Sequence, residues 1–285
     1  MNLPWVDFGC GATTLDHSGV EVVRDNVHLS VMAHARDWNA AAYVRTAAPI
    51  EAWGQKLMDR LELRGDETIL DAGCGTGRVT EELVARVPSG RVIGVDGSPS
   101  MIERARERLG DRVEFRVGDL LDLEQEPLVD VVFSSATFHW IADHDRLFAR
   151  LFAALKPGGR LLAQCGGAGN IAAVRAALDV VTSRDPYAAH FGGWPGPWNF
   201  AGPEETMARL ERAGFVDAHA GLHDEPVRPE NPPEFLATVI LGSHLDRLPG
   251  ELRDPFADAV LAELGEPLTV EYVRLTMSAR TPTAA

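Results

Sequence analysis

A glycine-rich turn in the first third of the chain has the residue types and spacing of a nucleoside-binding site. The stretch L-D-A-G-C-G-T-G, residues 70–77, places Asp71 ahead of Gly73, Cys74 and Gly75. Glycine accepts positive φ and lets the backbone approach a ligand closely, and a helix that begins at such a turn favours negative groups at its amino end. The glycine spacing by itself is equally compatible with a plain tight turn.

Two further acidic residues follow the turn. Asp96 and Gly97 end the run R-V-I-G-V-D-G about twenty residues later, where a carboxylate would hold the hydroxyl groups of a ribose. Gly118 and Asp119 end the next run, where the carboxylate could meet an adenine. Asp96 could instead cap the turn before Ser98, and Asp119 could be a solvated loop residue. Together with the glycine turn, these positions predict a nucleoside site at three strand ends.

The segment F-S-S-A-T-F-H-W, residues 133–140, contains the best candidate for a proton-transfer residue. His139 follows an apolar run and stands beside Trp140. Because imidazole titrates near neutral pH, histidine is the side chain most often used as a general base. The alternative is a histidine at the rim of the site that packs or hydrogen-bonds without taking part in catalysis.

Aromatic side chains are candidates for contact with a small-molecule ligand or substrate. Trp38 and Tyr43 could cover a bound ligand, and Trp194 could form the wall of a pocket with Trp198 and Phe200. The expected substrate-contact residues are Trp38, Tyr43, Trp140 and Trp194. Glycines and prolines surround Trp194, which is typical of a lid. Packing in the core or in a surface loop is the alternative for each of these residues.

An acidic substrate would need a local cation in the site, because the formal net charge of -15 gives the whole chain a field that repels anions. Guanidinium groups pair well with carboxylates, although a solvated surface position is the common alternative. The candidate arginines are Arg36, Arg45, Arg78 and Arg175.

A second Gly-Cys-Gly stands near the start of the chain, in W-V-D-F-G-C-G-A-T-T-L-D, residues 5–16. Only Trp5 to Phe8 precede this turn, which is too short for a buried central strand. Ala12 stands where the later copy has Thr76, and no helical pattern follows. We therefore interpret the early copy as a decoy and not as a second site.

Between residues 66 and 165, β-branched runs alternate with helical patterns. The expected strands are residues 68–72, 91–96, 113–119, 129–135 and 160–165, and the expected helices are 77–87, 98–109 and 144–155. This alternation predicts βαβ units and a parallel sheet with helices on both faces. Ligands of such sheets bind outside the carboxyl ends of the strands, which is where the candidate residues fall.

The pattern changes after Cys165. Helical spacing recurs at residues 170–181, 205–215, 233–245 and 251–264, and residues 216–223 are interpreted as a further strand. Residues 268–279 alternate between apolar and polar side chains, which predicts a final strand.

Composition excludes several classes of protein. The 285 residues suffice for one large α/β domain or for a domain with an inserted cap. The acidic balance argues against nucleic-acid binding, and no apolar run approaches the roughly 20 residues of a membrane span. Cys10, Cys74 and Cys165 are too few and too scattered for disulfides or a metal cluster. We expect no metal, no membrane contact, no secretion signal and a cytoplasmic location.

Three motifs resemble, in order and spacing, those of the class I S-adenosylmethionine-dependent methyltransferases. They are L-D-A-G-C-G-T-G, G-V-D-G-S-P-S-M and V-G-D-L, and the likeness continues through K-P-G-G-R-L-L-A. The resemblance implies a doubly wound α/β fold with a mostly parallel, Rossmann-like sheet of seven strands, the last antiparallel. We expect a small helical cap beside it. The implied cofactor is S-adenosylmethionine, with S-adenosylhomocysteine as its product.

The resemblance also implies roles for individual residues. Asp71 would lie near the ammonium group of the cofactor, and Asp96 would bind the ribose hydroxyls. Met101 and Leu120 would flank the adenine, with Asp119 toward its amine; helix core is the alternative for Met101. The expected cofactor-binding residues are Asp71, Gly73, Cys74, Gly75, Asp96, Gly97, Met101, Gly118, Asp119, Leu120 and Ser135.

A narrower likeness is to the trans-aconitate methyltransferase group, which methylates small carboxylic acids. It depends on F-S-S-A-T-F-H-W-I-A-D-H, G-G-A-G-N-I and W-N-A-A-A-Y. We predict methyl transfer to an oxygen of a small metabolite, with a carboxylate favoured. A carboxylate needs no base, whereas an alcohol or carbon acid does. Three alternatives stay open: a C- or N-methyltransferase, a cofactor-binding protein of this fold without methyl transfer, and an NAD-linked oxidoreductase.

We expect four segments along the chain. Residues 1–35 are an amino-terminal extension, and residues 36–165 form the cofactor-binding core. Residues 166–265 form the cap and one strand of the sheet, and residues 266–285 form the final antiparallel strand and tail. The expected partner is a small-molecule methyl acceptor, and a homodimer is a further possibility.

Overall fold

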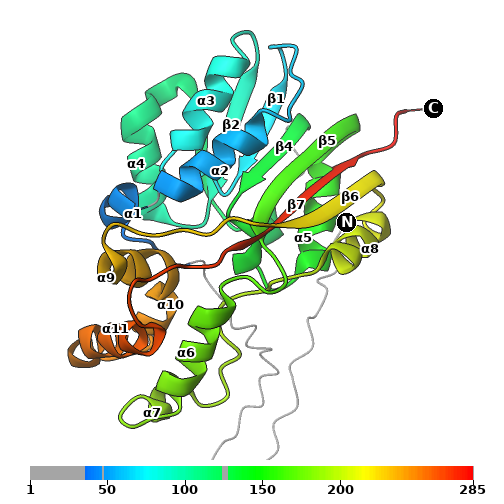
Figure 1. The fold of residues 1–285 in the computed structure, drawn as a ribbon. Coiled ribbons are helices and arrows are strands. Elements are labelled where there is room, and N and C mark those ends of the chain that lie inside the picture. Colours follow the sequence, from blue (N-terminus) through cyan, green and yellow to red (C-terminus); the bar gives the residue numbers. More distant parts are fainter. Residues whose placement is uncertain (1–35, 47, 124–127, 285) are drawn as a thin grey trace, which may run out of the picture. The chain divides into compact units, whose positions relative to one another are not determined.

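A mixed sheet of seven strands carries the described part of the chain (Figure 1). The computed structural model describes residues 36–46, 48–123 and 128–284. The early Gly-Cys-Gly turn, Cys10 and the expected extension 1–35 lie outside these residues. The strands are β1 (Thr68–Ala72), β2 (Arg91–Asp96), β3 (Glu114–Val117), β4 (Val129–Ser135), β5 (Leu155–Gly166), β6 (Val216–Asp224) and β7 (Val273–Arg280).

The strands lie in the order β3-β2-β1-β4-β5-β7-β6. Neighbouring strands from β3 to β5 pair in parallel, and β7 pairs antiparallel with both β5 and β6. The central strands are apolar and buried on both faces, as strands of a parallel sheet covered by helices must be. The predicted mostly parallel sheet with an antiparallel last strand is therefore confirmed.

Helices connect the strands and extend beyond the sheet. The longer helices are α2 (Ala48–Met58), α3 (Arg78–Arg86), α4 (Pro99–Leu109), α5 (His144–Ala154), α6 (Ala172–Thr182), α8 (Pro203–Arg212) and α11 (Gly250–Leu264). The shorter turns are α1 (Ala40–Thr46), η1 (Gly110–Arg112), η2 (Leu120–Asp122), η3 (Phe138–Trp140), α7 (Ala188–Phe191), α9 (Pro232–Phe235), η4 (Leu236–Ile240) and α10 (Gly242–Leu245). None of the helices in the described ranges is both long and apolar enough to cross a bilayer.

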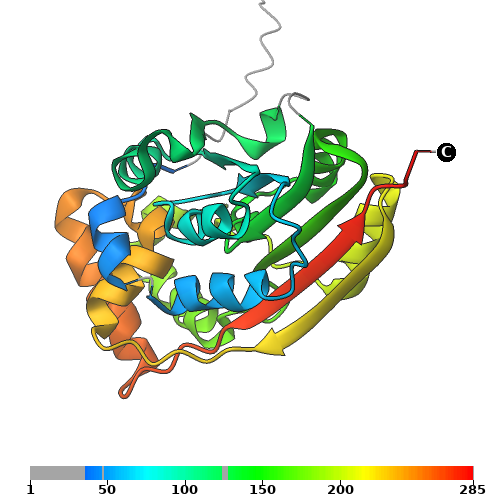
Figure 2. The same cartoon turned by 90° about the horizontal axis from the view of Figure 1, so that it is seen from above.

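Two hydrophobic cores hold the helices against the two faces of the sheet (Figure 2). On one face, α2, α3 and α4 pack apolar side chains such as Leu57 and Ile102 against Phe133 of β4. On the other face, α5 and α8 contribute Phe148 and Leu210. Because successive side chains of a strand point to opposite faces, the apolar runs of the central strands supply both cores.

A third core belongs to the cap. Helices α6 and α7 follow β5, and α9 to α11 lie between β6 and β7, on the side of the carboxyl ends of the parallel strands (Figure 1). Their buried residues, among them Phe235 and Phe256, form a separate cluster. Trp53 of α2 and Tyr272, just before β7, are also buried in this cluster, and their ring centroids lie 5.0 Å apart. The predicted helical cap is present.

Several boundaries differ from the sequence-based expectation, two of them most clearly. The last strand begins at Val273 and not at Leu268, because Leu268, Val270 and Tyr272 are buried in the core of the cap. Strand β5 begins at Leu155, earlier than predicted, since the Lys156–Gly159 segment continues the strand toward Thr281. Alternation alone could not separate a strand from an extended segment that packs elsewhere.

The turn after β1 requires glycine for two reasons. Gly73 has a φ of +84°, and a Cβ built there would lie 2.0 Å from Oγ1 of Thr137. Gly75 also has a positive φ, +53°, but a Cβ there would meet no atom within 4 Å. Gly73 thus combines left-handed backbone with a close approach, and Gly75 shows only the first.

We predict that Gly73→Ala lowers the free energy of unfolding by about 2–4 kcal/mol, because a left-handed alanine costs roughly 1–2 kcal/mol and the overlap with Thr137 adds strain. Gly75→Ala is the matched control and should show only the first cost. Urea denaturation of both variants measures the difference. Equal losses would show that Thr137 does not constrain the turn.

Candidate active site

The glycine turn is held by the neighbouring strand β2. The backbone N–H groups of Gly73 and Cys74 donate to the carbonyl of Val95 at 2.8 and 3.1 Å. The N–H of Gly75 donates to the carboxylate of Asp96 at 2.9 Å. The turn and the end of β2 therefore form one hydrogen-bonded unit without any ligand.

Asp71 is a buried acid at the end of β1, with 2% of its surface exposed. The hydroxyl of Thr80 donates to its carboxylate at 2.7 Å. Burial raises the pKa of Asp71 to about 7; the Thr80 hydrogen bond opposes the rise, and the charge of Asp96 adds to it. No cation pairs with Asp71 within the described ranges.

Asp96 caps the turn before Ser98, and its carboxylate can still accept further hydrogen bonds. Its two carboxylate oxygens accept hydrogen bonds from the N–H groups of Gly75 and Ser98, each at 2.9 Å. Burial raises the pKa of Asp96, while these two hydrogen bonds oppose the rise. Because a carboxylate has about four lone-pair sites, two remain for other donors such as ribose hydroxyls.

The next strand end joins this unit through its backbone. The N–H of Gly118 donates to the carbonyl of Asp96 at 3.0 Å. Asp119 is exposed and accepts from the N–H of Leu121 at 2.8 Å. Met101, in the first turn of α4, and Leu120, at the start of η2, are both buried. The structure thus brings the three predicted strand ends together, and the binding roles of these residues stay predictions.

A cavity of about 60 Å³ lies among the predicted residues. This volume corresponds to about two water molecules. Ser135 Oγ, Glu51 Oε1 and Arg78 Nε are buried there with no hydrogen-bond partner in the described part of the chain. The residues lining the cavity are Tyr43, Ile50, Glu51, Asp71, Gly73, Cys74, Gly75, Thr76, Arg78, Val79 and Ser135.

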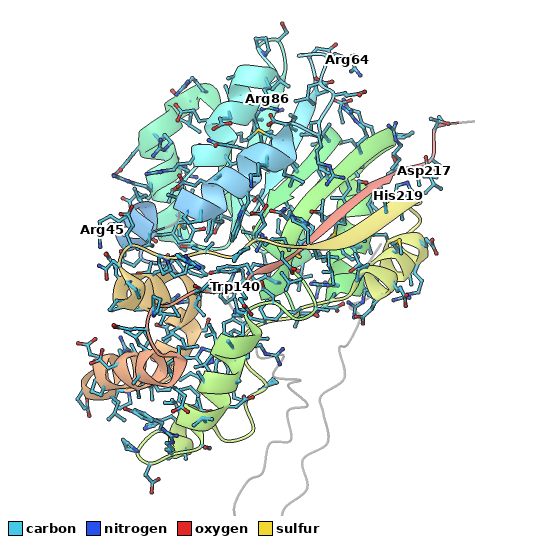
Figure 3. The ribbon with its side chains drawn as sticks, in the orientation of Figure 1. Arg45, Arg64, Arg86, Trp140, Asp217 and His219 are labelled. Carbon is cyan, nitrogen blue, oxygen red and sulfur yellow. The ribbon has the colours of Figure 1, made fainter. Side chains whose placement is uncertain are left out.

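Residues 36–46 contact the same edge of the sheet. The carboxylate of Asp37 accepts from the hydroxyl of Ser98 at 2.6 Å, and the N–H of Trp38 donates to that hydroxyl oxygen at 3.0 Å. The ring of Trp38 meets Tyr43 and Trp140 edge-on, at centroid distances of 5.9 and 5.1 Å. Three of the four predicted substrate-contact residues therefore lie together (Figure 3 labels Trp140).

His139 is buried in η3, between the rings of Trp140 and Phe200. Its Nδ1 accepts a hydrogen bond from the N–H of Gly166, the last residue of β5, at 3.3 Å. Burial holds the pKa of His139 well below its usual value, and the charge of Arg274 lowers it further. His139 is therefore neutral at pH 7, and the proton of the neutral ring lies on Nε2.

The aromatic loop divides between the site and the cap. Trp198 stacks on Phe200 at 5.7 Å and lies 6.1 Å from Trp140, so these rings gather around His139. Trp194 instead packs on His244 of the cap at 4.8 Å. The structure therefore does not bring Trp194 into contact with the other predicted substrate residues.

The candidate arginines are mostly neutralised by carboxylates. Arg36 pairs with Asp246, Arg45 with Glu234 and Arg78 with Glu51, at N–O distances of 2.6, 2.8 and 2.5 Å. Arg175 is exposed and lies 6.0 Å from the ring of Phe200. Three of the four therefore have a counter-charge already.

Arg274, a buried arginine of β7, is not among the residues that the sequence predicts for the site. Arg274, Thr276, Ser278 and Arg280 occupy alternate positions, a pattern that indicates a solvated face. Trp53 covers Arg274, with the guanidinium carbon 4.5 Å from the centre of the ring. The one available signal was a charged residue near the start of the strand. The sequence around Arg274 does not reveal that Trp53 packs on it.

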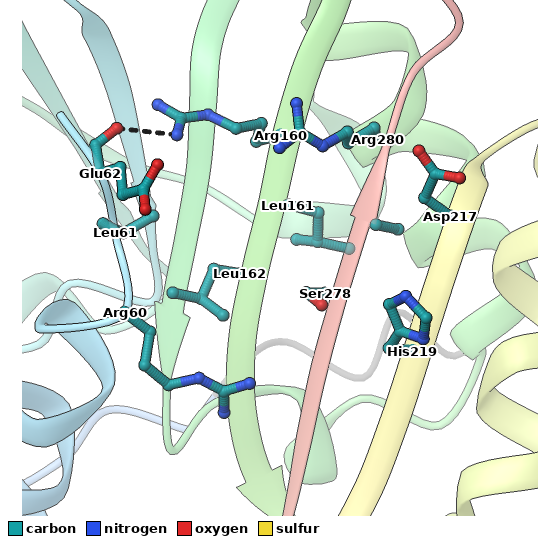
Figure 4. Close-up of a pocket in the computed structure, with 11 residues that line it drawn as sticks. Arg60, Leu61, Glu62, Arg160, Leu161, Leu162, Asp217, His219, Ser278 and Arg280 are labelled. Carbon is teal, nitrogen blue, oxygen red and sulfur yellow. Dashed lines mark hydrogen bonds between the residues drawn. The ribbon is translucent and has the colours of Figure 1, made fainter. Parts of the chain in front are cut away.

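A larger cavity, of about 480 Å³, lies over β5, β7 and β6 away from the carboxyl end of β5 (Figure 4). Arg60, Glu62, Arg160 and His219 contribute to its lining, and Arg160 donates to the carbonyl of Glu62 at 2.8 Å. None of the predicted site residues lines this cavity. We therefore do not assign the chemistry to it.

Cysteine and metal chemistry have no visible basis at this site. Cys74 and Cys165 are buried free thiols, and burial raises the pKa of Cys165 to about 12. Within the ranges that the structure describes, no group of three or more His, Cys, Asp and Glu residues could hold a metal ion.

Comparison with known proteins gives consistent similarities. Residues 69–159 match a family described as a methyltransferase domain. The chain is 39% identical over 129 residues to the trans-aconitate 2-methyltransferase of Variovorax paradoxus (strain S110), covering 45% of this chain and 49% of that protein. It is 33% identical over 185 residues to an uncharacterized methyltransferase of Schizosaccharomyces pombe, covering 62% and 70%.

The chain spans about half the length of the curated trans-aconitate 2-methyltransferases that it matches. Among solved structures, Haemonchus contortus phosphoethanolamine N-methyltransferase 2, in complex with phosphomonomethylethanolamine and S-adenosylhomocysteine, has a TM-score of 0.57. At 22% identity, covering 86% of this chain and 57% of that one, the similarity is one of fold.

We predict that Asp71→Asn stabilises the ligand-free protein at pH 8 and not at pH 4. The pKa of Asp71 is about 7 in the folded protein against an ordinary 3.8, so ionisation opposes folding. The penalty is absent below pH 3.8, grows as the pH rises and is complete above pH 7. It amounts to roughly 4 kcal/mol at most. Urea denaturation at both pH values measures it.

The exposed Asp119→Asn variant serves as the control for this prediction and should show little change at either pH. A difference between Asp71→Asn and the unmodified protein that is the same at pH 4 and pH 8 would contradict it.

Proposed function

This chain belongs to the class I S-adenosylmethionine-dependent methyltransferases, and we propose that it transfers a methyl group from that cofactor to a carboxylate oxygen of a small-molecule acceptor. The acceptor class is supported by the similarity to trans-aconitate 2-methyltransferases, at 37–39% identity over about half of their length. The structural observation that carries the choice is the hydrogen bond on Nδ1 of His139.

The strand ends fit the cofactor in charge and in shape. Asp71 and Asp96 are two carboxyl groups with raised pKa and, among the residues that the structure describes, no ion-pair partner, which suits a ligand with an ammonium and a sulfonium group. A Cβ on Gly75 would meet nothing within 4 Å, so the turn leaves open space. Bound there, the cofactor supplies a methyl group already activated on a positively charged sulfur.

Each acid has a separate task in this proposal. Asp96 would accept hydrogen bonds from the ribose hydroxyls with the lone pairs that Gly75 and Ser98 leave free. Asp71 would ionise beside the ammonium group, because an adjacent opposite charge lowers the pKa of a carboxyl. The unpartnered hydroxyl of Ser135 is available to the same ligand.

His139 is arranged to donate a hydrogen bond and not to take a proton. The N–H of Gly166 occupies the lone pair of Nδ1, which leaves the ring proton on Nε2. An alcohol or a carbon acid would need a base at this position, whereas an ionised carboxylate needs only a donor to orient it. The hydrogen bond to Gly166 therefore favours a carboxylate acceptor.

The aromatic side chains around His139 would exclude water. Trp140, Trp198 and Phe200 surround the imidazole with apolar surface. An in-line displacement depends on alignment of the reacting atoms, and well-placed groups reach effective molarities of about 10⁵ M or more. A carboxylate freed of its hydration shell is also a better nucleophile.

With S-adenosylmethionine carrying a labelled methyl group and a panel of mono-, di- and tricarboxylic acids, we expect label in a product that alkali hydrolyses, as an ester does. At saturating cofactor the rate should stay flat between about pH 6 and pH 8, since carboxylates titrate near pH 4. His139→Gln, which keeps an N–H donor, should retain more activity than His139→Phe.

Three outcomes would contradict this assignment. Label in an alkali-stable product would indicate a carbon, nitrogen or hydroxyl acceptor. A rate that rises about tenfold for each pH unit would indicate a base. Binding of S-adenosylhomocysteine with no labelled acceptor would indicate a binding protein of this fold.

We predict that Asp96→Ala weakens S-adenosylhomocysteine binding about 10- to 100-fold, the loss expected from hydrogen bonds to a charged group worth roughly 1.5–3 kcal/mol. Calorimetry measures the affinity, and circular dichroism checks that the variant is folded. Asp119→Ala, at an exposed site, should cost less. An unchanged affinity in folded Asp96→Ala would mean that this carboxylate only shapes the turn.

A further inference from the structure

Strand β7 carries a buried guanidinium that pairs with no carboxylate of the described residues. Arg274 has 2% of its surface exposed and lies opposite Gly166 of β5 and His223 of β6. No carboxylate oxygen within 4.0 Å pairs with it in the described part of the chain, and Glu225, the carboxylate that acts on its charge, pairs with Lys56 at 3.2 Å. A charge buried without a partner costs several kcal/mol, so an arginine at this position calls for a compensating interaction such as a bound anion.

The unpartnered atoms of Arg274 have the geometry of a binding group. Nε and Nη2 are both buried and neither finds an acceptor among the described residues. These two N–H groups lie on the same edge of the guanidinium and point in parallel, which matches the two oxygens of a carboxylate. The hydroxyl of Tyr272, buried two residues earlier, is likewise unpartnered and supplies a third donor.

Arg274 lies between the methyl-donor residues and the cap. Gly166, its partner in the strand ladder, donates to His139. Trp53, which covers the guanidinium, and Tyr272 both belong to the core of the cap. Arg274 does not line the small cavity at the glycine turn, where Arg78 is the arginine present. It therefore lies beside Gly166, the hydrogen-bond donor to His139, and outside the lining of that cavity.

We propose that Arg274, assisted by Tyr272, binds a carboxylate of the methyl acceptor and so determines its specificity. The assignment rests on the methyl transfer proposed above. A carboxylate gripped by the guanidinium has both oxygens engaged and is a poor nucleophile, so the bound carboxylate is distinct from the one that is methylated. The acceptor then carries at least two carboxylates, one for Arg274 and one for the reaction.

The test measures binding, which requires no turnover. Protein loaded with S-adenosylhomocysteine is titrated calorimetrically with trans-aconitate, with succinate and with the uncharged trimethyl ester of trans-aconitate. The unmodified protein should bind the acids and not the ester. Arg274→Met should weaken acid binding by at least about 30-fold, the loss typical of removing one member of a buried charge pair. Its affinity for S-adenosylhomocysteine should stay within about twofold.

Further variants separate the contribution of the parallel N–H pair of the guanidinium from that of its positive charge. Arg274→Lys keeps the charge without the parallel N–H pair and should bind the acids with intermediate affinity. Tyr272→Phe should lose a smaller factor. Arg45→Met removes an exposed, paired arginine and should bind as the unmodified protein does. Because Arg274→Met removes an unpaired buried charge, its melting temperature should be unchanged or higher, which excludes misfolding as the cause.

The outcomes distinguish this inference from the proposed function. Undiminished acid binding by Arg274→Met, or no acid binding by the unmodified protein, would overturn it. Weaker S-adenosylhomocysteine binding with unchanged acid binding would also overturn it, since the guanidinium would then serve the carboxylate of the cofactor. If no acid is ever methylated but acid binding depends on Arg274, the anion site stands and the proposed methyl transfer fails.

Discussion

Uncompensated charge, buried at one edge of the sheet, is the constraint on which the remaining features depend. Asp71, which is buried, and Asp96, which is partly buried, lie at the ends of the adjacent strands β1 and β2, and the buried Arg274 lies opposite the end of β5; none has an ion-pair partner among the described residues. Removing such charges from water is costly. A positively charged donor beside the two acids and an acidic acceptor on the guanidinium would supply the missing charges. Methyl transfer would then cancel the charge of the donor sulfur against that of the attacking oxygen.

The parallel half of the fold could be predicted because its signals are local. Each strand end carries its own mark, a glycine turn after β1 and an acid after β2 and β3. The order of the strands brings these marks together, and backbone hydrogen bonds from Gly75 and Gly118 to Asp96 join them. The helix cap at Ser98 was predictable for the same reason, since its partner, the N–H of Met101, is three residues away.

The acceptor side could not be predicted in the same way, because distant parts of the chain decide it. Arg274 belongs to an alternating polar pattern that indicates a solvated face, whereas in the fold it is buried and the ring of Trp53 in α2 lies against its guanidinium. Conversely, Arg36 and Arg45 were reasonable anion ligands until the cap supplied Asp246 and Glu234 as their partners. The tautomer of His139 likewise depends on the N–H of Gly166, which its own neighbours in sequence do not reveal.

Because the cap has its own hydrophobic core, it can change in sequence without disturbing the packing of the sheet, and substrate specificity can change with it. Two chain segments, 167–202 and 225–272, build the cap, and both are inserted at the same edge of the sheet. Substitutions within them can reshape the acceptor side while the glycine turn and the cores under α2–α5 keep their packing. The cap and the sheet with its glycine turn thus have separate hydrophobic cores. Exchange of residues 167–202 and 225–270, with Trp53 and Tyr272 retained as members of the cap core, is a route by which this architecture can acquire other substrates.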